Sequence, residues 1–576
     1  MQRGFIGGRS MVANIIDVDH EAQMVALTQE GGALVLFDFA AAFLSLDHHF
    51  LLRTLEVAGL PPALLSYVRT LYSSNECHIH LGGRRWAGFA LTAVSIDILL
   101  RRIHRLHLKV LVRAFADDIA LVVPQWWAVA SGLARLFSDF AGIAGLELNL
   151  PKTLLIPLWV EDLTAVRINI ARRVPSWAAL SVETYGTYLG MVVGPGSPGR
   201  SWSKPLAKFR ERVQHLAEQG LGLYAAINGY HIFAQSVLLF VAQLEELPAS
   251  AIAAEEWAFG RLMPGPGAWI LPWEARHLDL LGFPCTFRSL AHVAVAAKAR
   301  LMRYENSAHG GLQLSQSARD LDKAEADTVY IVRQGVWASW FARSFPRKLK
   351  EAVRNLEDTG LPRAVVDDII LGNAPRPHTA SQVCIVRQSF QRRIAFELRV
   401  RARPCMEPRL RHKIGRWHPP LFPRLAVGRL NTLFGRLNKL VPPRVVAACI
   451  RTLYNGWMTQ RRLQQRGHCR FACVGEEDSI EHYACCPVVR NFGCRRLQLE
   501  DVVEARPTRI ARFVSLGVWL GYPSEAELAR RAVLVYAVYR AVLLHRHAIA
   551  PSESFAAEAL PQFAREAVRH HRRRND

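Results

Sequence analysis

Two adjacent aspartates lie where the sequence predicts the turn of a β-hairpin. Residues 110–116 and 119–123 are apolar runs typical of two paired strands, and Asp117 and Asp118 fall between them. A third aspartate, Asp38, ends another apolar strand upstream. Three carboxylates at strand ends would supply the hard oxygen ligands that Mg²⁺ prefers alongside substrate phosphates. Two such ions could activate a primer 3′-hydroxyl and stabilise the pyrophosphate leaving group in nucleotidyl transfer.

The plain alternative is that Asp117 and Asp118 form a solvated turn, because Asp is a common turn residue. Two charges at the tip of a buried hairpin are costly without a cation, which favours the metal site. What surrounds the pair in the sequence decides between the two interpretations.

A second set of possible metal ligands follows further along the chain. Cys469, Cys473, His482 and Cys486 are separated by three, eight and three residues. Three thiolates and one imidazole at this spacing fit a closed tetrahedral Zn²⁺ site, and the adjoining Cys485 could replace Cys486. Five of the ten cysteines crowd into this segment, which indicates a metal site in a reducing compartment. The alternative is a group of buried free cysteines beside a surface histidine.

Composition indicates a folded nucleic-acid binder. The 576 residues are long enough for several domains, and half of them are hydrophobic. Lys and Arg number 72 against 49 Asp and Glu, giving a net charge of +23, although a membrane-surface protein could share such an excess. The absence of a long apolar run or a cleavable leader predicts no membrane span and no secretion, and hence a nuclear or cytoplasmic protein.

The Phe-Ala-Asp-Asp hairpin resembles the catalytic motif of reverse transcriptases of non-LTR retrotransposons. Further blocks follow in that family's order. They are similar to its QxGFxxGRS, DxxxxF, GLxLNxxKT and YLGxxxG segments and lie at 2–10, 38–43, 145–153 and 188–194. Between them a helix is expected over 128–140, and helices over 204–244 resemble the family's thumb.

The resemblance implies an α+β fold, with the fingers, palm and thumb of a right-hand polymerase built on an antiparallel palm sheet. A mainly helical C-terminal half with a small zinc module would follow. It implies RNA-directed DNA polymerase activity on an RNA template, with a DNA primer or target and dNTPs as partners. Asp38, Asp117 and Asp118 would then hold two Mg²⁺ ions.

The resemblance also assigns roles to other residues. Phe43 would exclude a ribose 2′-hydroxyl, although a Phe is more commonly a core residue. Lys152 would stabilise charge at the triphosphate, although a lone Lys is commonly a solvated surface residue. Tyr188, Leu189 and Gly190 would belong to the primer grip.

Two departures from the family pattern bear on activity. The R-Q-G-x-P-L-S-P block that opens a long palm helix is missing, and the sequence passes directly from Ala93 to Val94. A deletion, or a wrongly removed exon segment, would explain this junction. The chain also begins inside the fingers without an upstream endonuclease, so we expect that it cannot complete retrotransposition alone.

We expect five regions along the chain. They are partial fingers and palm (1–200), thumb (201–250), a helical and basic connector (251–440), the zinc-knuckle region (441–500) and a C-terminal helical segment with a basic tail (501–576). The Pro-Gly-Pro-Gly run at 264–267 indicates a boundary. Residues 275–375 are expected to be mainly helical, and a helix is expected over 525–546.

The stretch at 375–423 is basic and is expected to be rich in loops. It would lie against template RNA or target DNA, or it is merely a solvated surface. Trp417 and Phe422 there would stack on unpaired bases or, alternatively, pack in the core.

The segment around the cysteines resembles the finger that follows the reverse transcriptase in many such elements. Arginines between 461 and 466 precede it, so the module would hold target DNA or the element's own RNA. Two rival interpretations remain. One is a catalytically inactive relic that still binds nucleic acid. The other is a group II intron maturase, against which the Cys-Cys-His-Cys module argues. The RNA template and the oligomeric state stay open.

Overall fold

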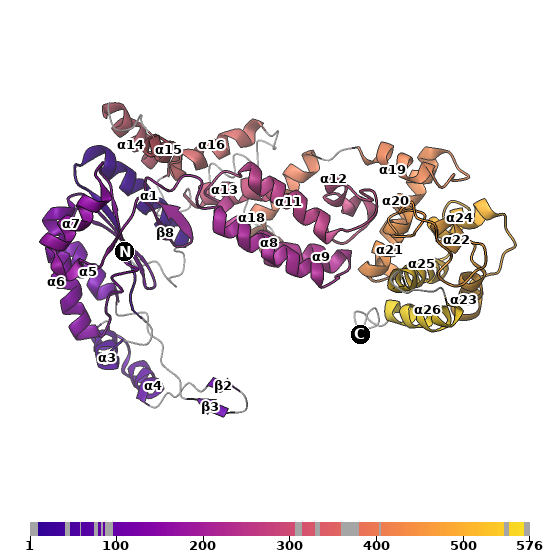
Figure 1. Ribbon diagram of the computed structural model, residues 1–576, viewed down its shortest axis with the longest axis horizontal. Helices are drawn as coiled ribbons and strands as arrows, with labels where there is room; N and C mark the ends of the chain where they lie inside the picture. The colour runs from indigo at the N-terminus through magenta and orange to yellow at the C-terminus, as the bar shows by residue number, and fades with distance from the viewer. Residues whose placement is uncertain are drawn as a thin grey trace. The chain divides into compact units, whose positions relative to one another are not determined.

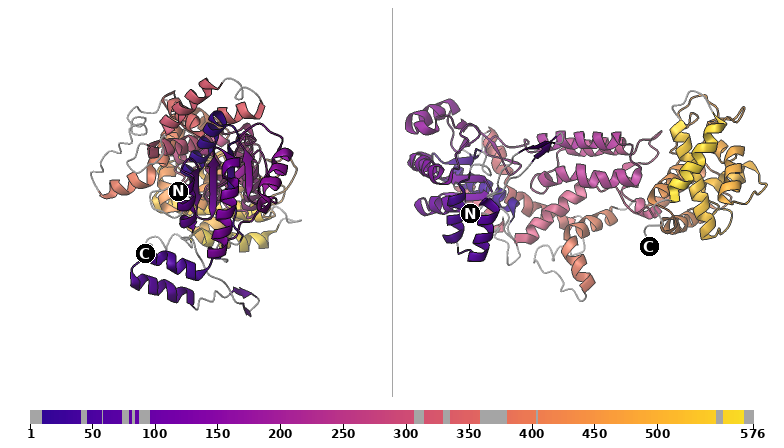
Figure 2. Two further views of the ribbon diagram at one scale, coloured as in Figure 1. Left: turned by 90° about the vertical axis from the view of Figure 1, so that its left-hand side faces the viewer. Right: turned by 90° about the horizontal axis from the view of Figure 1, so that it is seen from below.

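The computed structural model describes a chain that divides into two compact units (Figures 1 and 2). The described residues are 10–40, 46–57, 59–73, 79–81, 84–86, 96–305, 314–328, 335–358, 380–402, 405–545 and 552–568. The first unit comprises Met1–Lys204, Val241–Glu246 and Val295–Gln391, and the second comprises Pro205–Phe240, Leu247–Ala294 and Arg392–Asp576. Residues 2–9, Phe43, the Ala93–Val94 junction and the basic tail lie outside the described residues.

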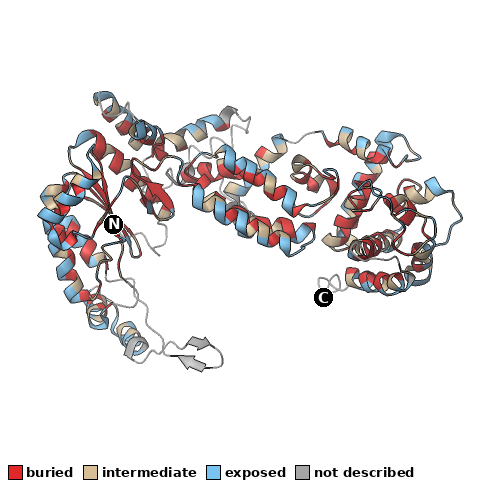
Figure 3. Cartoon of the chain, viewed as in Figure 1, coloured by how far each residue is buried: buried red, intermediate tan, exposed pale blue. Residues whose placement is uncertain are grey.

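A small, mostly antiparallel sheet forms the centre of the first unit, so the fold is of the mixed α+β class. Its order is β4-β5-β1-β6-β7. The strands are β1 (Ala33–Phe37), β4 (Leu111–Phe115), β5 (Asp118–Val123), β6 (Leu154–Pro157) and β7 (Ser181–Val182). Only the β6–β7 pairing is parallel among the described strands of this sheet. All five residues of β1 are buried, as expected for a central strand (Figure 3).

Helices cover both faces of this sheet. On one face α5 (Ile96–Leu106), α6 (Trp126–Ala144) and α7 (Leu163–Arg173) join the alternate residues of the strands in one apolar core. Within it the rings of Phe37 and Phe137 stack at 4.5 Å between centroids. On the other face lies α1 (Met11–Thr28), whose Asn14 donates a hydrogen bond to the carbonyl of Ala114 at 2.8 Å.

Buried polar side chains tie distant parts of the first unit to α1. Asp19 accepts a hydrogen bond from the indole of Trp340 at 3.0 Å. It also forms an ion pair with Arg343 at 3.1 Å. Arg343 also pairs with Glu245 at 3.2 Å. These links explain why helices late in the sequence belong to the same unit as the sheet, a grouping that the expected five regions did not include.

The remaining elements of the first unit are short or peripheral. They are α3 (His48–Val57), α4 (Pro62–Ser73), β2 (Ile79–Leu81), β3 (Arg84–Trp86), η1 (Pro175–Trp177), β8 (Gly186–Tyr188), β9 (Met191–Val193), α14 (Leu314–Asp327), α15 (Gly335–Ala342) and α16 (Phe345–Asp358). The chain passes between the units within α8 (Ser203–Glu218), α10 (Gln235–Ala242), α13 (Leu290–Glu305) and α18 (Ala380–Arg401), and also between Glu246 and Leu247.

The described part of the second unit consists of helices joined by loops. They are α9 (Leu223–Gly229), the π-helical turn η2 (Tyr230–Ala234), α11 (Ala249–Leu262), α12 (Pro272–Ala275), η3 (Leu278–Leu281), α19 (Met406–Gly415), α20 (Pro423–Leu440), α21 (Pro443–Leu453), α22 (Ile480–Tyr483), α23 (Pro487–Leu497), α24 (Arg506–Val514), α25 (Glu525–His545) and α26 (Glu553–Val568).

Several sequence predictions of secondary structure are confirmed. The strands at 33–37, 110–116 and 119–123 and the helices at 128–140 and 525–546 are all present, with ends within a few residues. The prediction that 375–423 is rich in loops is wrong for its described part, where α18 and α19 are helical. The physical reason is that these helices are rich in Arg and α18 also in Gln, both strong helix formers.

The Pro-Gly-Pro-Gly run at 264–267 lies inside the second unit rather than at an edge of it. Trp269 folds back over Gly265, where an added Cβ would lie 2.2 Å from its indole Cδ1 atom. Glycine is therefore needed for this close contact. Among the described residues, one helical stretch, Leu223–Ala242, is long and apolar enough to cross a membrane by length and composition alone, and half of its most apolar window is buried within the protein.

Candidate functional site

The register of the sheet brings the three predicted aspartates to one edge. Phe37 pairs with Ile119, so Asp38 and Asp118 are the next residues along two antiparallel neighbours. Asp117 lies in the two-residue turn between β4 and β5. Central strands, buried on both faces, therefore deliver three carboxylates to the end of the sheet where β1 stops.

The hairpin tip holds an unusual backbone conformation. Ala116 has a φ of +57°, a value that favours glycine, at the first position of the turn. Strained residues of this kind cluster at functional sites, where the surrounding structure holds them in place. Asp117 and Asp118 follow this residue directly.

The electrostatics of this edge are those of crowded like charges. Asp38 and Asp117 are half-buried and Asp118 is exposed. Desolvation by the surrounding protein raises the pKa of Asp118, and the negative charges of Asp117 and Asp38 raise it further. Burial and its two neighbours therefore disfavour ionisation of Asp118, an effect that a bound cation would relieve.

The block at 145–153 is fastened to the backbone of Asp38. The amide of Asn149 donates to the Asp38 carbonyl at 2.8 Å, and the Asp38 amide donates to the hydroxyl of buried Thr153 at 3.3 Å. Lys152, whose amide bonds the Asn149 carbonyl at 3.0 Å, is exposed beside this junction. The sequence did not single out Asn149 or Thr153, although both belong to the conspicuous block.

The predicted primer-grip residues form the turn of a second hairpin. Leu189 and Gly190 have φ of +49° and +84°, the pattern of a type I′ turn between β8 and β9. Tyr188 is buried, so its ring packs in the protein, whereas Gly190 is exposed. A Cβ at Gly186 would lie 2.8 Å from Leu36 Cδ1, so this glycine lets the hairpin approach the central sheet.

The second candidate site is a compact cluster of cysteines and one histidine in the second unit. The ligand atoms of Cys469, Cys473, His482 and Cys486 all lie within 4.8 Å of one another, an arrangement that could bind a metal such as zinc. Among the described residues, the three aspartates do not form so close a group. Cys485 is not part of the cluster.

Local structure explains how the four ligands converge. The Cys469 amide bonds the Glu476 carbonyl at 2.8 Å, and Ala472 and Gly475, both at positive φ, turn the chain between them. Ser479 then caps the short helix α22 by accepting from the His482 amide at 3.1 Å. Cys486 in turn precedes the first residue of α23.

The histidine of this cluster is oriented for metal binding. Its Nδ1 atom lies 3.0 Å from a carboxylate oxygen of Glu476. Its Nε2 atom is buried and has no hydrogen-bond partner among the described residues. A carboxylate on one ring nitrogen fixes the tautomer that leaves the other free to bind a metal. The sequence analysis missed Glu476, although its position between the cysteine and histidine ligands was a usable signal.

The thiols of the cluster differ in pKa, and hence in how readily each ionises. A hydrogen bond from Cys486 lowers the pKa of the Cys469 thiol to about 4. Burial raises the pKa of Cys473 to about 11, and its sulfur lies 3.5 Å from that of Cys486. Sulfurs this close, one of them readily ionised, suit a thiophilic cation.

Comparison with known protein families and with curated proteins finds no match to this chain. The functional argument therefore rests on the residues and the geometry described above.

Proposed function

We propose that this chain is an RNA-directed DNA polymerase of the non-LTR retrotransposon type. One observation carries the proposal: Asp38 and the Asp117–Asp118 pair, 79 residues apart by the numbering, meet at one edge of a buried antiparallel sheet. A strained hairpin tip and the block bonded to Asp38 support it. The right-hand polymerase architecture belongs to the proposal.

The proposed chemistry uses two Mg²⁺ ions at the aspartates. The ions would lower the pKa of a primer 3′-hydroxyl and neutralise charge on the departing pyrophosphate of the incoming dNTP. Asp38, Asp117 and Asp118 would hold them, Lys152 would face the triphosphate, and Phe43 would select the deoxyribose. The protein's own contribution is to hold the carboxylates in place through the sheet register.

Primer extension on an RNA template with Mg²⁺ and dNTPs tests this function. We expect extension by the full chain, reduced on the order of 1,000-fold by Asp117→Asn, because several kcal/mol of transition-state stabilisation depend on the ions. Asp139→Asn on the exposed side of α6 removes the same charge elsewhere and should extend normally. Equal activity of the Asp117→Asn protein and the wild type would refute the proposed site.

A second candidate function is nucleic-acid binding without catalysis. The missing Gln-Gly-Pro-Leu-Ser-Pro block favours it, and the charge of +23 is compatible with it. This candidate predicts salt-sensitive RNA binding with no extension. Restoring the missing block between Ala93 and Val94 would then distinguish a damaged polymerase from a protein that never polymerised.

The cysteine cluster would hold Zn²⁺ and form a small module that contacts target DNA or the element's RNA. Such work on nucleic acid is consistent with a nuclear or cytoplasmic protein that is not anchored to a membrane. Zinc content measured on the purified chain, with Cys485→Ser as the matched control, tests the choice of metal.

A further inference from the structure

Three cations of the second unit lie against the loop at 264–269, and the charge of a fourth, Arg416, acts on one of them, Lys413. They come from α19, α21 and the two segments that follow these helices. We call Lys413, Arg416, Arg451 and Arg462 the Trp269 basic cluster, after the indole at the centre of the loop. Trp269 and Lys413 are 144 positions apart in the sequence, yet they are hydrogen-bonded to each other in the structure.

Neutral groups hold two of these cations in place. Lys413 Nζ donates to the Trp269 carbonyl at 2.7 Å and lies 5.1 Å from the centre of the Tyr454 ring. Arg451 lies 4.3 Å from the Trp269 ring centre and donates to the Pro264 carbonyl at 3.0 Å. Carbonyls and aromatic faces attract cations but carry no net charge, so the positive charge stays available to an anion.

The nearby carboxylates are already engaged by other arginines. Glu274 is fully buried and pairs with Arg409 at 3.1 Å, and Glu481, whose charge acts on Arg416, lies 4.0 Å from Arg461. Among the described residues, no carboxylate lies within 4.0 Å of any cation of the cluster. The buried Nε atom of Arg462 likewise has no hydrogen-bond partner in the described part of the chain.

The cations also disfavour one another. Burial lowers the pKa of Lys413 to about 8, and the charges of Arg409, Arg462 and Arg416 lower it further against the opposing charge of Glu274. Like charges at such a density destabilise a protein unless something else balances them.

We propose that the Trp269 basic cluster is a binding site for the phosphodiester backbone of a nucleic acid. Arg416, which is exposed, and Arg462 offer planar donors that match phosphate oxygens. Lys413 supplies a further point charge at the loop, on the Trp269 carbonyl. Gly267 makes room for this arrangement, since a Cβ there would lie 2.8 Å from an Arg462 nitrogen.

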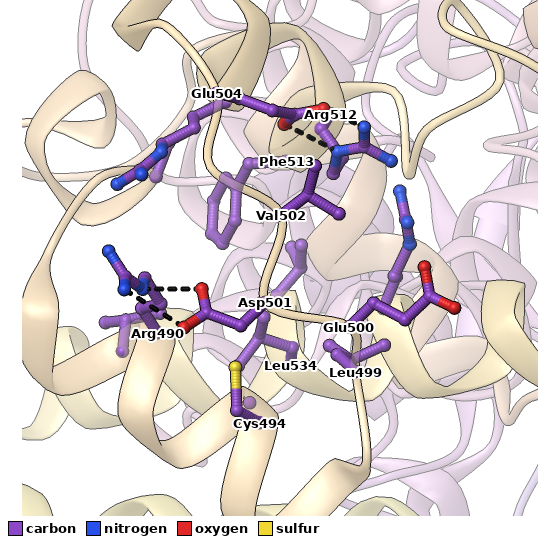
Figure 4. A pocket seen from close by; sticks show the side chains of 16 residues that line it. Arg490, Cys494, Leu499, Glu500, Asp501, Val502, Glu504, Arg512, Phe513 and Leu534 are labelled. Carbon is purple, nitrogen blue, oxygen red and sulfur yellow. Dashed lines mark hydrogen bonds and ion pairs between the residues drawn. The ribbon is translucent and has the colours of Figure 1, made fainter.

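A second arginine-rich region of the same unit differs from the Trp269 basic cluster, because its arginines pair with carboxylates. An open pocket of about 120 Å³ is lined by residues of α23, α24 and α25 and of the loop at 499–504 (Figure 4). There Arg490 pairs with Asp501 at 2.8 Å and Arg512 with Glu504 at 2.9 Å. These arginines are neutralised by carboxylates, so we expect them to contribute little to phosphate binding.

The inference rests on the proposed function in one respect, that the protein binds a nucleic acid. It does not depend on catalysis. Binding is therefore measured without extension. Loss of extension with cluster-dependent binding retained would count against the polymerase alone. Normal extension with no dependence on the cluster would count against this site alone.

The test compares full-length proteins by fluorescence anisotropy on poly(U) RNA and on a DNA duplex of matched length, over a series of KCl concentrations. One protein carries Lys413→Gln, Arg416→Gln and Arg462→Gln. The control carries Arg53→Gln, Arg101→Gln and Arg490→Gln, three exposed arginines that each pair with a carboxylate. Both proteins lose three positive charges.

For the cluster variant we expect affinity for the RNA to fall on the order of 10- to 100-fold. The slope of log K against log[KCl] should become shallower by about 2, since each lost contact to a single strand removes about 0.7. The control should keep the wild-type slope. Loss on RNA alone, on DNA alone or on both identifies which backbone the site takes, and wild-type affinity and slope on both would overturn the proposal.

Folding and protonation provide two further checks. The cluster variant should melt no lower than the wild type without nucleic acid, and a charge-preserving variant, Lys413→Arg with Arg462→Lys, should bind with the wild-type slope. A phosphate beside Lys413 would raise its pKa, so binding at pH about 8 should take up protons. Calorimetry in buffers of different ionisation enthalpy measures this uptake, and its presence in Lys413→Gln would contradict the assignment.

Discussion

The two candidate metal sites differ in how far the protein alone assembles them. The four ligand atoms of the cysteine cluster lie within 4.8 Å of one another, whereas the three aspartates share a sheet edge without forming so close a group. Thiols and imidazole can be neutral and can hydrogen-bond to one another, so protein packing can bring them together. Ionised carboxylates repel: burial raises the pKa of Asp118, and the charges of Asp117 and Asp38 raise it further.

This difference indicates what a bound metal would contribute at each site. The cysteine cluster closes a loop around its ligands, and a metal there would contribute to folding. The aspartate edge is held open by a rigid sheet, and cations there would contribute to chemistry while the fold stays the same. Metal removal should therefore affect the structure of one region and only the activity of the other.

Breaking the cysteine cluster should give the largest effect. Chelation, or Cys469→Ser, should unfold the segment at 467–486, because structural Zn²⁺ contributes on the order of 10 kcal/mol to such small modules. Hydrogen exchange of the Cys469 and His482 amides measures the opening. Cys485→Ser, which removes a thiol outside the cluster, should change neither zinc content nor protection. Full protection after chelation would show that the module folds without metal.

Removing the carboxylate behind the histidine should have a smaller effect. Glu476→Gln keeps the shape of the side chain but weakens its hold on His482 Nδ1, so metal affinity should fall about 10- to 100-fold. Competition with a zinc chelator measures the change. Glu477→Gln is the matched control, because the neighbouring carboxylate is exposed and pairs with Arg461 instead. Equal losses in both variants would indicate a general charge effect.

Much of both candidate sites could be predicted from the sequence because each of their residues belongs to a short local pattern. The apolar runs before Asp38 and around Asp117 predicted the strands. The cysteine spacing predicted all four members of the cluster. The pairing of the strands was harder to predict, because β1 pairs with β5 and β6 through contacts between residues far apart in the chain. The exclusion of Cys485 likewise depends on the turn after α22, which points its thiol toward the Arg506 carbonyl at 3.9 Å.

Contacts between distant segments account for what the sequence could not indicate. The Pro-Gly-Pro-Gly run is typical of a boundary, yet its glycines make room for Trp269 and Arg462. The pairing of Asp19 with Arg343 joins residues more than 300 positions apart and decides which helices belong to the first unit. Neither contact leaves a periodic pattern, so periodicity and composition cannot reveal it.

The smallest predicted effect concerns the aspartate edge and tests whether its carboxylates repel one another when no cation is bound. Asp118→Asn removes a charge that Asp117 and Asp38 disfavour, so without divalent cations the first unit should become more stable, by less than about 1 kcal/mol because Asp118 is exposed. Thermal melting in EDTA measures the gain, with Asp139→Asn as the control that should change nothing. Mg²⁺ should reverse the order, since only the wild type keeps all three carboxylates for the ions. A less stable Asp118→Asn protein in EDTA would mean that its carboxylate makes favourable contacts within the protein, and that the aspartate edge is a structural feature rather than a site held in readiness for cations.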